Sequence, residues 1–175
     1  RVEETATNGL VQDGDNWTYR FAAKLPMDAM GSYTLGVEGR LDAAIDVGED
    51  EPFEDEDQME TFSVAFAVTV DSVMPRRKIV DDYKCENCHS RLSLHGDNRQ
   101  NATDYCQTCH SPDATDAAVR PEGTGEPQSI DFRYMVHKIH AGAELETGYT
   151  VYGYRSSFHD YSEIHYVGEL SNCEG

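Results

Sequence analysis

The sequence predicts a protein of mixed class. An N-terminal, all-β antiparallel sandwich or split barrel is expected over residues 1–74, followed by a loop-rich domain with a few short α-helices over residues 75–175. Alternating apolar and polar residues in the first part indicate strands. After Pro75 branched aliphatic residues become sparse, and all seven histidines and all five cysteines follow. This change in character predicts the domain boundary.

Three segments of the first part show the period of two that is typical of half-buried strands. In the clearest of them Phe62, Val64 and Phe66 alternate with small or polar residues, so one face should be covered and the other exposed. Short Gly- and Asp-containing turns separate the strands, as in a small antiparallel domain. The expected strands are residues 16–25, 32–37 and 61–70.

The net charge of −19 is strongly acidic. It argues against a nucleic-acid partner, which needs a basic face, and gives no reason to expect binding to anionic lipid. We interpret it as an aid to solubility or an adaptation to salt. Much of the excess lies between Glu49 and Glu60, which we expect to form an exposed, mobile loop. A calcium site there is an alternative, although the D-x-D-x-D-G pattern is missing.

The chemistry is expected in two copies of Cys-x-x-Cys-His. The first is Cys85, Cys88 and His89; the second is Cys106, Cys109 and His110. In exported proteins this motif attaches c-type haem, because two thiols add to the porphyrin and the next histidine binds the iron. The sequence thus predicts two complete haem c sites.

A zinc ribbon is the main alternative, because two Cys-x-x-Cys pairs at this separation can also form a four-cysteine zinc site. A ribbon needs no histidine after either pair, and here a histidine follows both. We therefore prefer haem. Since the second part has few aliphatic residues, bound porphyrins would supply much of its core, and the domain is predicted to be organised by its haems.

Further histidines are candidates for the sixth ligands. Residues 129–141 predict a helix capped by Ser129 and ended by Gly142, on which His137 and His140 share a face. His95 follows His89 too closely to cross easily to the opposite face of the same haem, so it is expected to serve another one. Two more histidines, at 159 and 165, lie among tyrosines that we expect to pack on porphyrin with wet hydroxyls, and their role as ligands stays open.

Nothing in the sequence predicts a membrane helix, since no apolar run approaches eighteen residues and the mean hydropathy is −0.64. Haem attachment of this kind takes place outside the cytoplasm. We therefore expect a mature or excised part of an exported protein. Cys173 is the one cysteine outside the two motifs. We expect it to begin a third, cut Cys-x-x-Cys-His and so to bind a third haem.

The chain resembles the OmcA/MtrC family of outer-membrane decahaem c-type cytochromes in four segments: RRKIVDDYKCENCHSRLSLHGDNR, YCQTCHSPDATD, SIDFRYMVHKIHAG and VYGYRSSFHDYSEIHYVGEL. They are similar to the start of the first haem domain, and residues 16–70 to the end of the β-domain before it. The resemblance implies Greek-key β-domains, pentahaem domains and bis-histidine ligation, with His95, His137 and His140 as axial ligands. It also implies electron transfer to extracellular metal oxides, flavins or electrodes.

We therefore expect an electron carrier rather than a catalyst. Its expected partners are redox proteins, other haem domains of the same parent chain and extracellular acceptors, and its expected location is the outer-membrane surface or the extracellular space, with the periplasm as the alternative. Two histidine ligands leave no open position on the iron. The alternatives are a multihaem reductase with one open-site haem, or a zinc-ribbon binding module.

Overall fold

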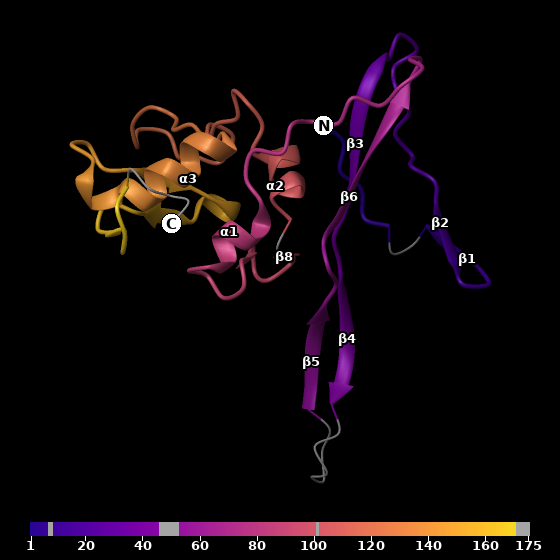
Figure 1. Cartoon of the computed structure of the whole chain (residues 1–175), viewed down its shortest axis with the longest axis horizontal. Coiled ribbons are helices and arrows are strands. Elements are labelled where there is room, and N and C mark those ends of the chain that lie inside the picture. The colour runs from indigo at the N-terminus through magenta and orange to yellow at the C-terminus, as the bar shows by residue number, and fades with distance from the viewer. Residues whose placement is uncertain (7–8, 46–52, 101, 171–175) are drawn as a thin grey trace. The chain divides into compact units, whose positions relative to one another are not determined.

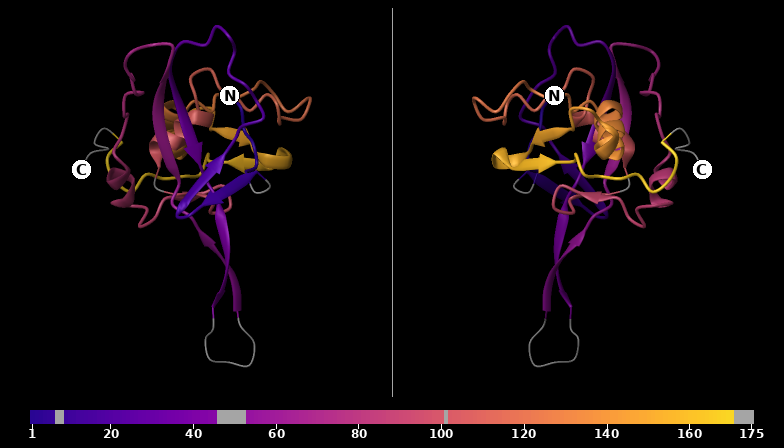
Figure 2. Two further views of the ribbon diagram at one scale, coloured as in Figure 1. Left: turned by 90° about the vertical axis from the view of Figure 1, so that its right-hand side faces the viewer. Right: turned by 90° about the vertical axis from the view of Figure 1, so that its left-hand side faces the viewer.

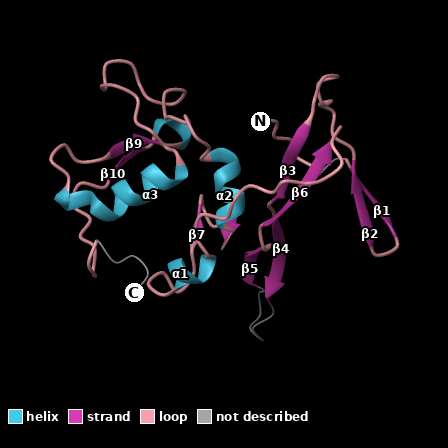
Figure 3. Cartoon of the chain, turned by 45° about the horizontal axis from the view of Figure 1, so that its top comes forward, coloured by secondary structure: helices cyan, strands magenta, loops and turns pink. Residues whose placement is uncertain are grey.

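The computed structural model of the chain describes residues 1–6, 9–45, 53–100 and 102–170, with the backbone alone for residues 41–45 and 53–58. The elements are short (Figure 1). The strands are β1 (Leu10–Asp13), β2 (Asn16–Tyr19), β3 (Gly31–Val37), β4 (Arg40–Ile45), β5 (Phe53–Gln58), β6 (Phe62–Val68), β7 (Ser93–Leu94), β8 (Arg99–Gln100), β9 (Thr150–Tyr152) and β10 (Phe158–Asp160). The helices, drawn in cyan in Figure 3, are α1 (Asp82–Glu86), α2 (Thr103–Cys109) and α3 (Phe132–Ala141), with the 3₁₀ turns η1 (Gly142–Glu144) and η2 (Tyr154–Ser156).

Two compact units divide the chain. The first contains residues 1–35 and 64–76, and the second contains residues 36–63 and everything from residue 77 onward. Strands β3 and β6 run from one unit into the other. The second unit therefore contains both cysteine motifs together with β4 and β5, which come from the strand-rich part of the sequence.

In the first unit β1 and β2 form an antiparallel hairpin. The strand expected over residues 16–25 ends early, at Tyr19. The reason is Glu4, whose carboxylate accepts hydrogen bonds from the backbone N–H groups of Ala22 (2.9 Å) and Ala23 (2.8 Å) and from the Tyr19 hydroxyl (2.8 Å). Backbone groups that bond to a side chain are not available for a strand ladder.

The described strands do not form the expected sandwich or barrel, because they pair only two at a time. The pairing is antiparallel for β1 with β2, β4 with β5, β7 with β8 and β9 with β10. β6 keeps the predicted alternation but with the opposite exposure. Phe62, Val64 and Phe66 are 58%, 43% and 36% exposed, whereas the intervening small residues are half-buried. The large apolar side chains of β6 are therefore its more exposed ones in the described part of the chain.

The acidic stretch 49–60 was expected to be a mobile loop, and this is wrong for residues 53–58, which form β5. β5 pairs with β4 in an antiparallel register from Arg40↔Gln58 to Ile45↔Phe53. Figure 2 shows the two strands running side by side. Most acidic positions of β5 stand opposite uncharged residues of β4, so ladder hydrogen bonds form without a full row of facing like charges. Residues 49–52, and with them the calcium alternative, lie outside the described residues.

The helix predicted from residue 129 begins later, as α3 at Phe132. Its N-cap is Asp131 rather than Ser129, because the Asp131 carboxylate accepts from the backbone N–H of Tyr134 at 3.1 Å. A carboxylate at this position also faces the positive end of the helix dipole. Gly142 ends the helix as predicted.

The core of the second unit is small and partly polar. Its buried apolar side chains are Phe132, Tyr149 and Val151, within the described part of the chain. Beside them lies an ion pair between Asp116, 1% exposed, and Arg120, whose side chain is 6% exposed. Their N···O distance is 2.7 Å, and together they join the loop of residues 116–128 to β9. No described helix is long and apolar enough to span a membrane.

Candidate functional site

The first motif lies at the end of α1. The backbone N–H groups of Cys88 and His89 both donate to the carbonyl of Cys85, at 3.2 and 2.9 Å, so the chain continues to turn as in a helix. Residues three and four apart in a helical turn lie on the same face. The Cys85 and Cys88 thiols and the His89 ring are therefore presented together, with Cys88 and His89 exposed.

The second motif repeats this arrangement on α2. Cys106 and Cys109 lie within the helix, and His110 follows as its C-cap, with its N–H bonded to the Cys106 carbonyl at 2.9 Å. The two motifs are tied together through buried Thr103, which is 0% exposed. Its N–H donates to Asp82 of α1 at 2.8 Å, and its hydroxyl donates to the Val80 carbonyl at 3.2 Å.

The structure brings the motif histidines together with two of the three candidate sixth ligands. The ring centroids of His89 and His140 are 5.9 Å apart, and those of His95 and His110 are 6.0 Å apart. Each pair joins the histidine of one motif to a histidine outside both motifs, 51 residues away for His140 and 15 residues away for His95. His137 lies in neither pair; its exposed ring bonds through Nδ1 to the Arg133 carbonyl at 2.7 Å.

These separations fit a metal ion held between two imidazoles. Two metal–nitrogen bonds of about 2 Å each and two ring radii of about 1.2 Å give roughly 6.4 Å between centroids. The observed 5.9 and 6.0 Å lie within about half an ångström of that value. Direct ring stacking would also bring aromatic centroids within this range, but two such pairs, each with a motif histidine, match what bis-histidine haem sites require.

Hydrogen bonds indicate which ring nitrogen carries the proton in two of these histidines. His110 Nδ1 lies 2.8 Å from the Ile130 carbonyl, and His140 Nδ1 lies 2.8 Å from the Val136 carbonyl. A carbonyl only accepts, so Nδ1 carries the proton and Nε2 keeps its lone pair. This backbone bond is the usual way in which proteins orient a metal-binding histidine.

Burial keeps several groups of the site neutral. It lowers the pKa of His95, with help from Arg99 and His110, and thus favours the uncharged imidazole that can bind a metal. It also raises the pKa of the Cys106 thiol to about 11, and raises that of Cys85. No disulfide joins any of the four motif cysteines.

The zinc alternative receives no support from the arrangement of these thiols. Within the described ranges no three His, Cys, Asp or Glu side chains converge as a metal cluster needs. A structural zinc site requires four ligands at one point. Cys173, the candidate for a third attachment site, lies outside the described residues.

A cluster that the sequence did not predict lies beside the second motif. Glu38 pairs with Arg99 through two hydrogen bonds, one of them 3.0 Å from Nη2 to Oε1, and it also accepts from the Tyr105 hydroxyl at 2.8 Å. Burial and the bond to Glu38 raise the pKa of Tyr105 to about 12. Glu38 is more than sixty residues from both partners in the sequence, so no local pattern could have indicated the cluster.

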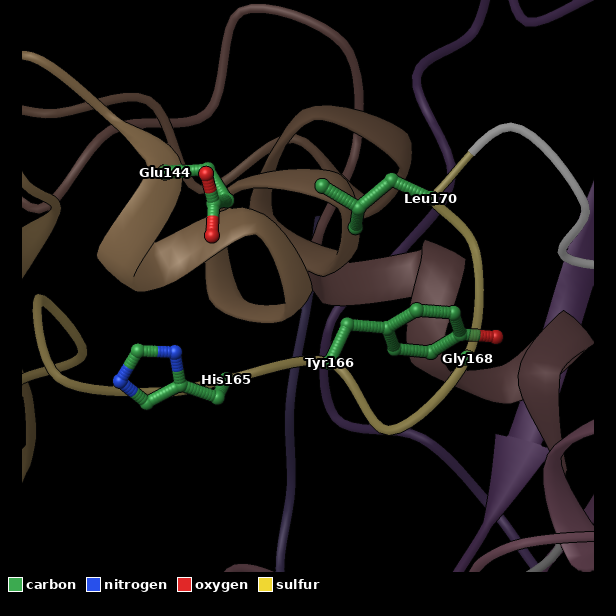
Figure 4. Close-up of a pocket in the computed structure, with 5 residues that line it drawn as sticks. All are labelled: Glu144, His165, Tyr166, Gly168 and Leu170. Carbon is green, nitrogen blue, oxygen red and sulfur yellow. The ribbon is translucent and has the colours of Figure 1, made fainter.

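The remaining histidines have other surroundings. His159 Nε2 lies 2.9 Å from the Ser157 hydroxyl and its ring stacks on Tyr161. His165 and Tyr166 line a pocket of about 290 Å³ (Figure 4). The Tyr166 ring also packs edge-on against His140. The other lining residues are Glu144, Gly168 and Leu170.

Tyr149 corrects the expectation of wet tyrosine hydroxyls. It is 2% exposed, its ring stacks on Tyr161, and its hydroxyl donates to the Ser129 carbonyl at 2.7 Å. In the described chain Tyr149 is therefore a core residue whose hydroxyl is hydrogen-bonded within the protein.

The buried Asp116–Arg120 pair is a site feature that the sequence analysis did not single out. Its Asp-x-x-x-Arg spacing is visible in the sequence, but ordinary surface pairs have the same spacing.

Comparison with known proteins adds one match. The family model for the outer membrane cytochrome MtrC/MtrF-like domains II/IV matches residues 77–175, which is more than half of the chain. Searches of curated proteins and of solved structures found no significant match. The matched residues contain both cysteine motifs, both histidine pairs and all three helices. The chain therefore belongs to the MtrC/MtrF-like family of outer membrane cytochromes.

Proposed function

We propose that this chain transfers electrons through two covalently attached c-type haems, each held by two histidines. The observation that carries the proposal is the pairing of each motif histidine with a histidine outside the motifs at a centroid separation of 5.9 or 6.0 Å. Family membership supports the same role, because the matching family consists of outer membrane cytochromes.

The residues divide into two sets. At the first site Cys85 and Cys88 would hold the porphyrin, with His89 and His140 as axial ligands. A bound haem supplies a one-electron iron couple, whose potential two imidazoles keep lower than a histidine and a methionine would. His140 is held in the orientation that leaves Nε2 free by its bond to the Val136 carbonyl.

At the second site Cys106 and Cys109 would hold the porphyrin, with His110 and His95 as ligands. The contact between Asp82 and Thr103 keeps α1 and α2 adjacent, and so keeps the two sites close. Electrons pass between haems only over short distances, so this contact serves the relay directly. The small protein core agrees with haems that complete the packing of this unit.

His137 is left for a haem other than these two. Its ring is exposed on α3, and because its Nδ1 donates to the Arg133 carbonyl, its Nε2 faces away from the helix backbone.

We propose further that the protein works at the outer-membrane surface or outside the cell, where redox proteins, other haem domains of the parent chain or external acceptors exchange electrons with it. Protease treatment of intact cells tests this location, because a periplasmic protein would be protected.

The ligand pairs are tested by removing one site and then probing the other. Cys85→Ala/Cys88→Ala should leave one haem per chain by intact mass. In this background His95→Ala should convert the remaining ferric iron to high spin in electron paramagnetic resonance, whereas His140→Ala should leave it low-spin. The control is His159→Ala, which changes an exposed histidine outside both pairs.

Other outcomes would contradict the proposal. An unchanged mass after loss of both cysteines would show that no haem is attached there. High-spin signals in the unaltered protein would indicate the open-site reductase, and a colourless, zinc-containing protein would indicate the binding module. If His140→Ala rather than His95→Ala affected the second site, the two ligand pairs would be exchanged.

A further inference from the structure

The turn that carries His95 is held in an unusual backbone conformation. His95, Gly96 and Asp97 all have positive φ, at 57°, 66° and 64°. Glycine adopts this region freely, but two of these three residues have a Cβ, and each such residue costs about 1 kcal/mol or more. The surrounding structure must therefore fix the turn, since an isolated hairpin of two two-residue strands would relax.

Three side chains from the segment between β3 and β6 hold this turn. Arg40 donates from Nη2 to the Gly96 carbonyl and from Nε to the Asn98 side-chain oxygen. The Thr61 hydroxyl accepts from the Gln100 N–H at 3.1 Å. Glu38 binds the Arg99 guanidinium through two hydrogen bonds. All of these residues belong to the second unit.

Glu38 also fixes the other half of the same site. Its Oε2 accepts from the hydroxyl of Tyr105, which lies on α2 immediately before Cys106. The Tyr105 ring lies directly against Gly36, where a Cβ would collide with it. One carboxylate thus connects the turn of His95 to the helix that presents His110.

We propose that Glu38, Arg40 and Thr61 are positioning residues for the second haem site, which hold His95 opposite His110. The inference rests on the proposed function, since it takes His95 as a ligand of the haem attached at Cys106 and Cys109. It assigns a role in the electron-transfer site to a segment that lies before the family match and carries no cysteine or histidine of its own.

The test compares spin states in the haem-loaded full chain. Glu38→Ala/Arg40→Ala should raise the high-spin fraction of the ferric resonance signal about tenfold, because the detached state of His95 gains population when its turn is released. His95→Ala should produce the full high-spin signal of one haem. Arg40→Lys, with Glu38 unchanged, keeps the positive charge and one donor nitrogen. It should therefore show much more of the low-spin signal than the double variant does. The matched control is Glu60→Gln, an exposed acidic residue beside Thr61.

The outcomes separate this inference from the proposed function. If His95→Ala gives the high-spin signal but the double variant does not, positioning by Glu38 and Arg40 is refuted while the ligand assignment stands. If His95→Ala changes nothing, His95 is not a ligand, and both the assignment and the inference fail. An equal response of Glu60→Gln would also overturn the inference.

Loss of folding is checked by haem content from intact mass and by far-ultraviolet circular dichroism. If the double variant does not retain its haems, Thr61→Val replaces it, because valine keeps the shape of threonine but removes the hydroxyl that accepts from the Gln100 N–H at 3.1 Å and donates to the Asn98 carbonyl at 3.5 Å. A smaller rise in the high-spin fraction is then expected, and no rise would refute the proposal.

Discussion

Replacing Asp116 by asparagine should strongly destabilise the second unit. The Asp116 carboxylate is buried and accepts from Arg120 Nη2 at 2.7 Å and from the backbone N–H groups of Gln128 at 2.8 Å and Tyr152 at 3.0 Å. Asparagine has nearly the same shape, but it leaves Arg120 buried without its counter-charge and turns an N–H₂ group toward other donors. Breaking a buried pair from one side costs about 3–5 kcal/mol.

Such a loss is a large fraction of the total stability of a domain, which is about 5–15 kcal/mol. The assay is urea unfolding of the haem-loaded protein at pH 7, followed by circular dichroism and by the haem absorbance. Glu122→Gln is the control, because this exposed residue lies in the same loop and should change the free energy of unfolding by less than about 0.5 kcal/mol. A loss below about 1 kcal/mol for Asp116→Asn would refute the reasoning.

The effect should also depend on pH. Burial raises the pKa of Asp116, but Arg120 and the two backbone N–H groups outweigh it and hold the pKa below its usual value. A carboxyl whose pKa is lower in the folded state stabilises the fold above the unfolded pKa of about 3.9, and the contribution is lost as the pH falls through the folded pKa. The difference between wild type and Asp116→Asn should therefore be constant near neutral pH and shrink below about pH 5.

Two further predictions concern local packing. Gly36→Ala should lower the unfolding free energy by about 1–3 kcal/mol, because the new methyl group collides with the Tyr105 ring; unfolding in urea measures this, and an unchanged midpoint would contradict the close approach. Asp131→Ala should remove the cap of α3 and cost about 1 kcal/mol, whereas Ser129→Ala should cost markedly less. Equal losses for the two variants would show that the cap assignment is wrong.

Local patterns predicted the parts of the structure that depend on neighbouring residues. The strands near residues 32–37 and 61–70, the helix over most of residues 129–141 and its end at Gly142 all follow from periodicity and capping, and the structure has them as β3, β6 and α3. The cap moved by two residues because Ser129 and Asp131 could both serve, and the sequence does not say which backbone N–H comes within reach of which side chain.

Exposure was less predictable than secondary structure. The large apolar face of β6 was expected to be covered, yet in the described chain it is the more exposed face. The alternation shows only that the two faces of the strand differ in their side chains. Which face is covered depends on what packs against it. The early end of β2 has a similar origin, because it depends on Glu4, which is eighteen residues from Ala22.

The sequence by itself predicted the chemistry that we propose for this protein, and the tertiary structure decided which distant residues lie together. Cys-x-x-Cys-His predicts the attachment residues and one ligand of each proposed site, because covalent tethers and adjacent positions are local. The pairing of His89 with His140 and of His95 with His110, and the contact of Glu38 with Arg99 and Tyr105, join residues up to 67 positions apart. Such contacts depend on how the whole unit packs, which local periodicity does not encode.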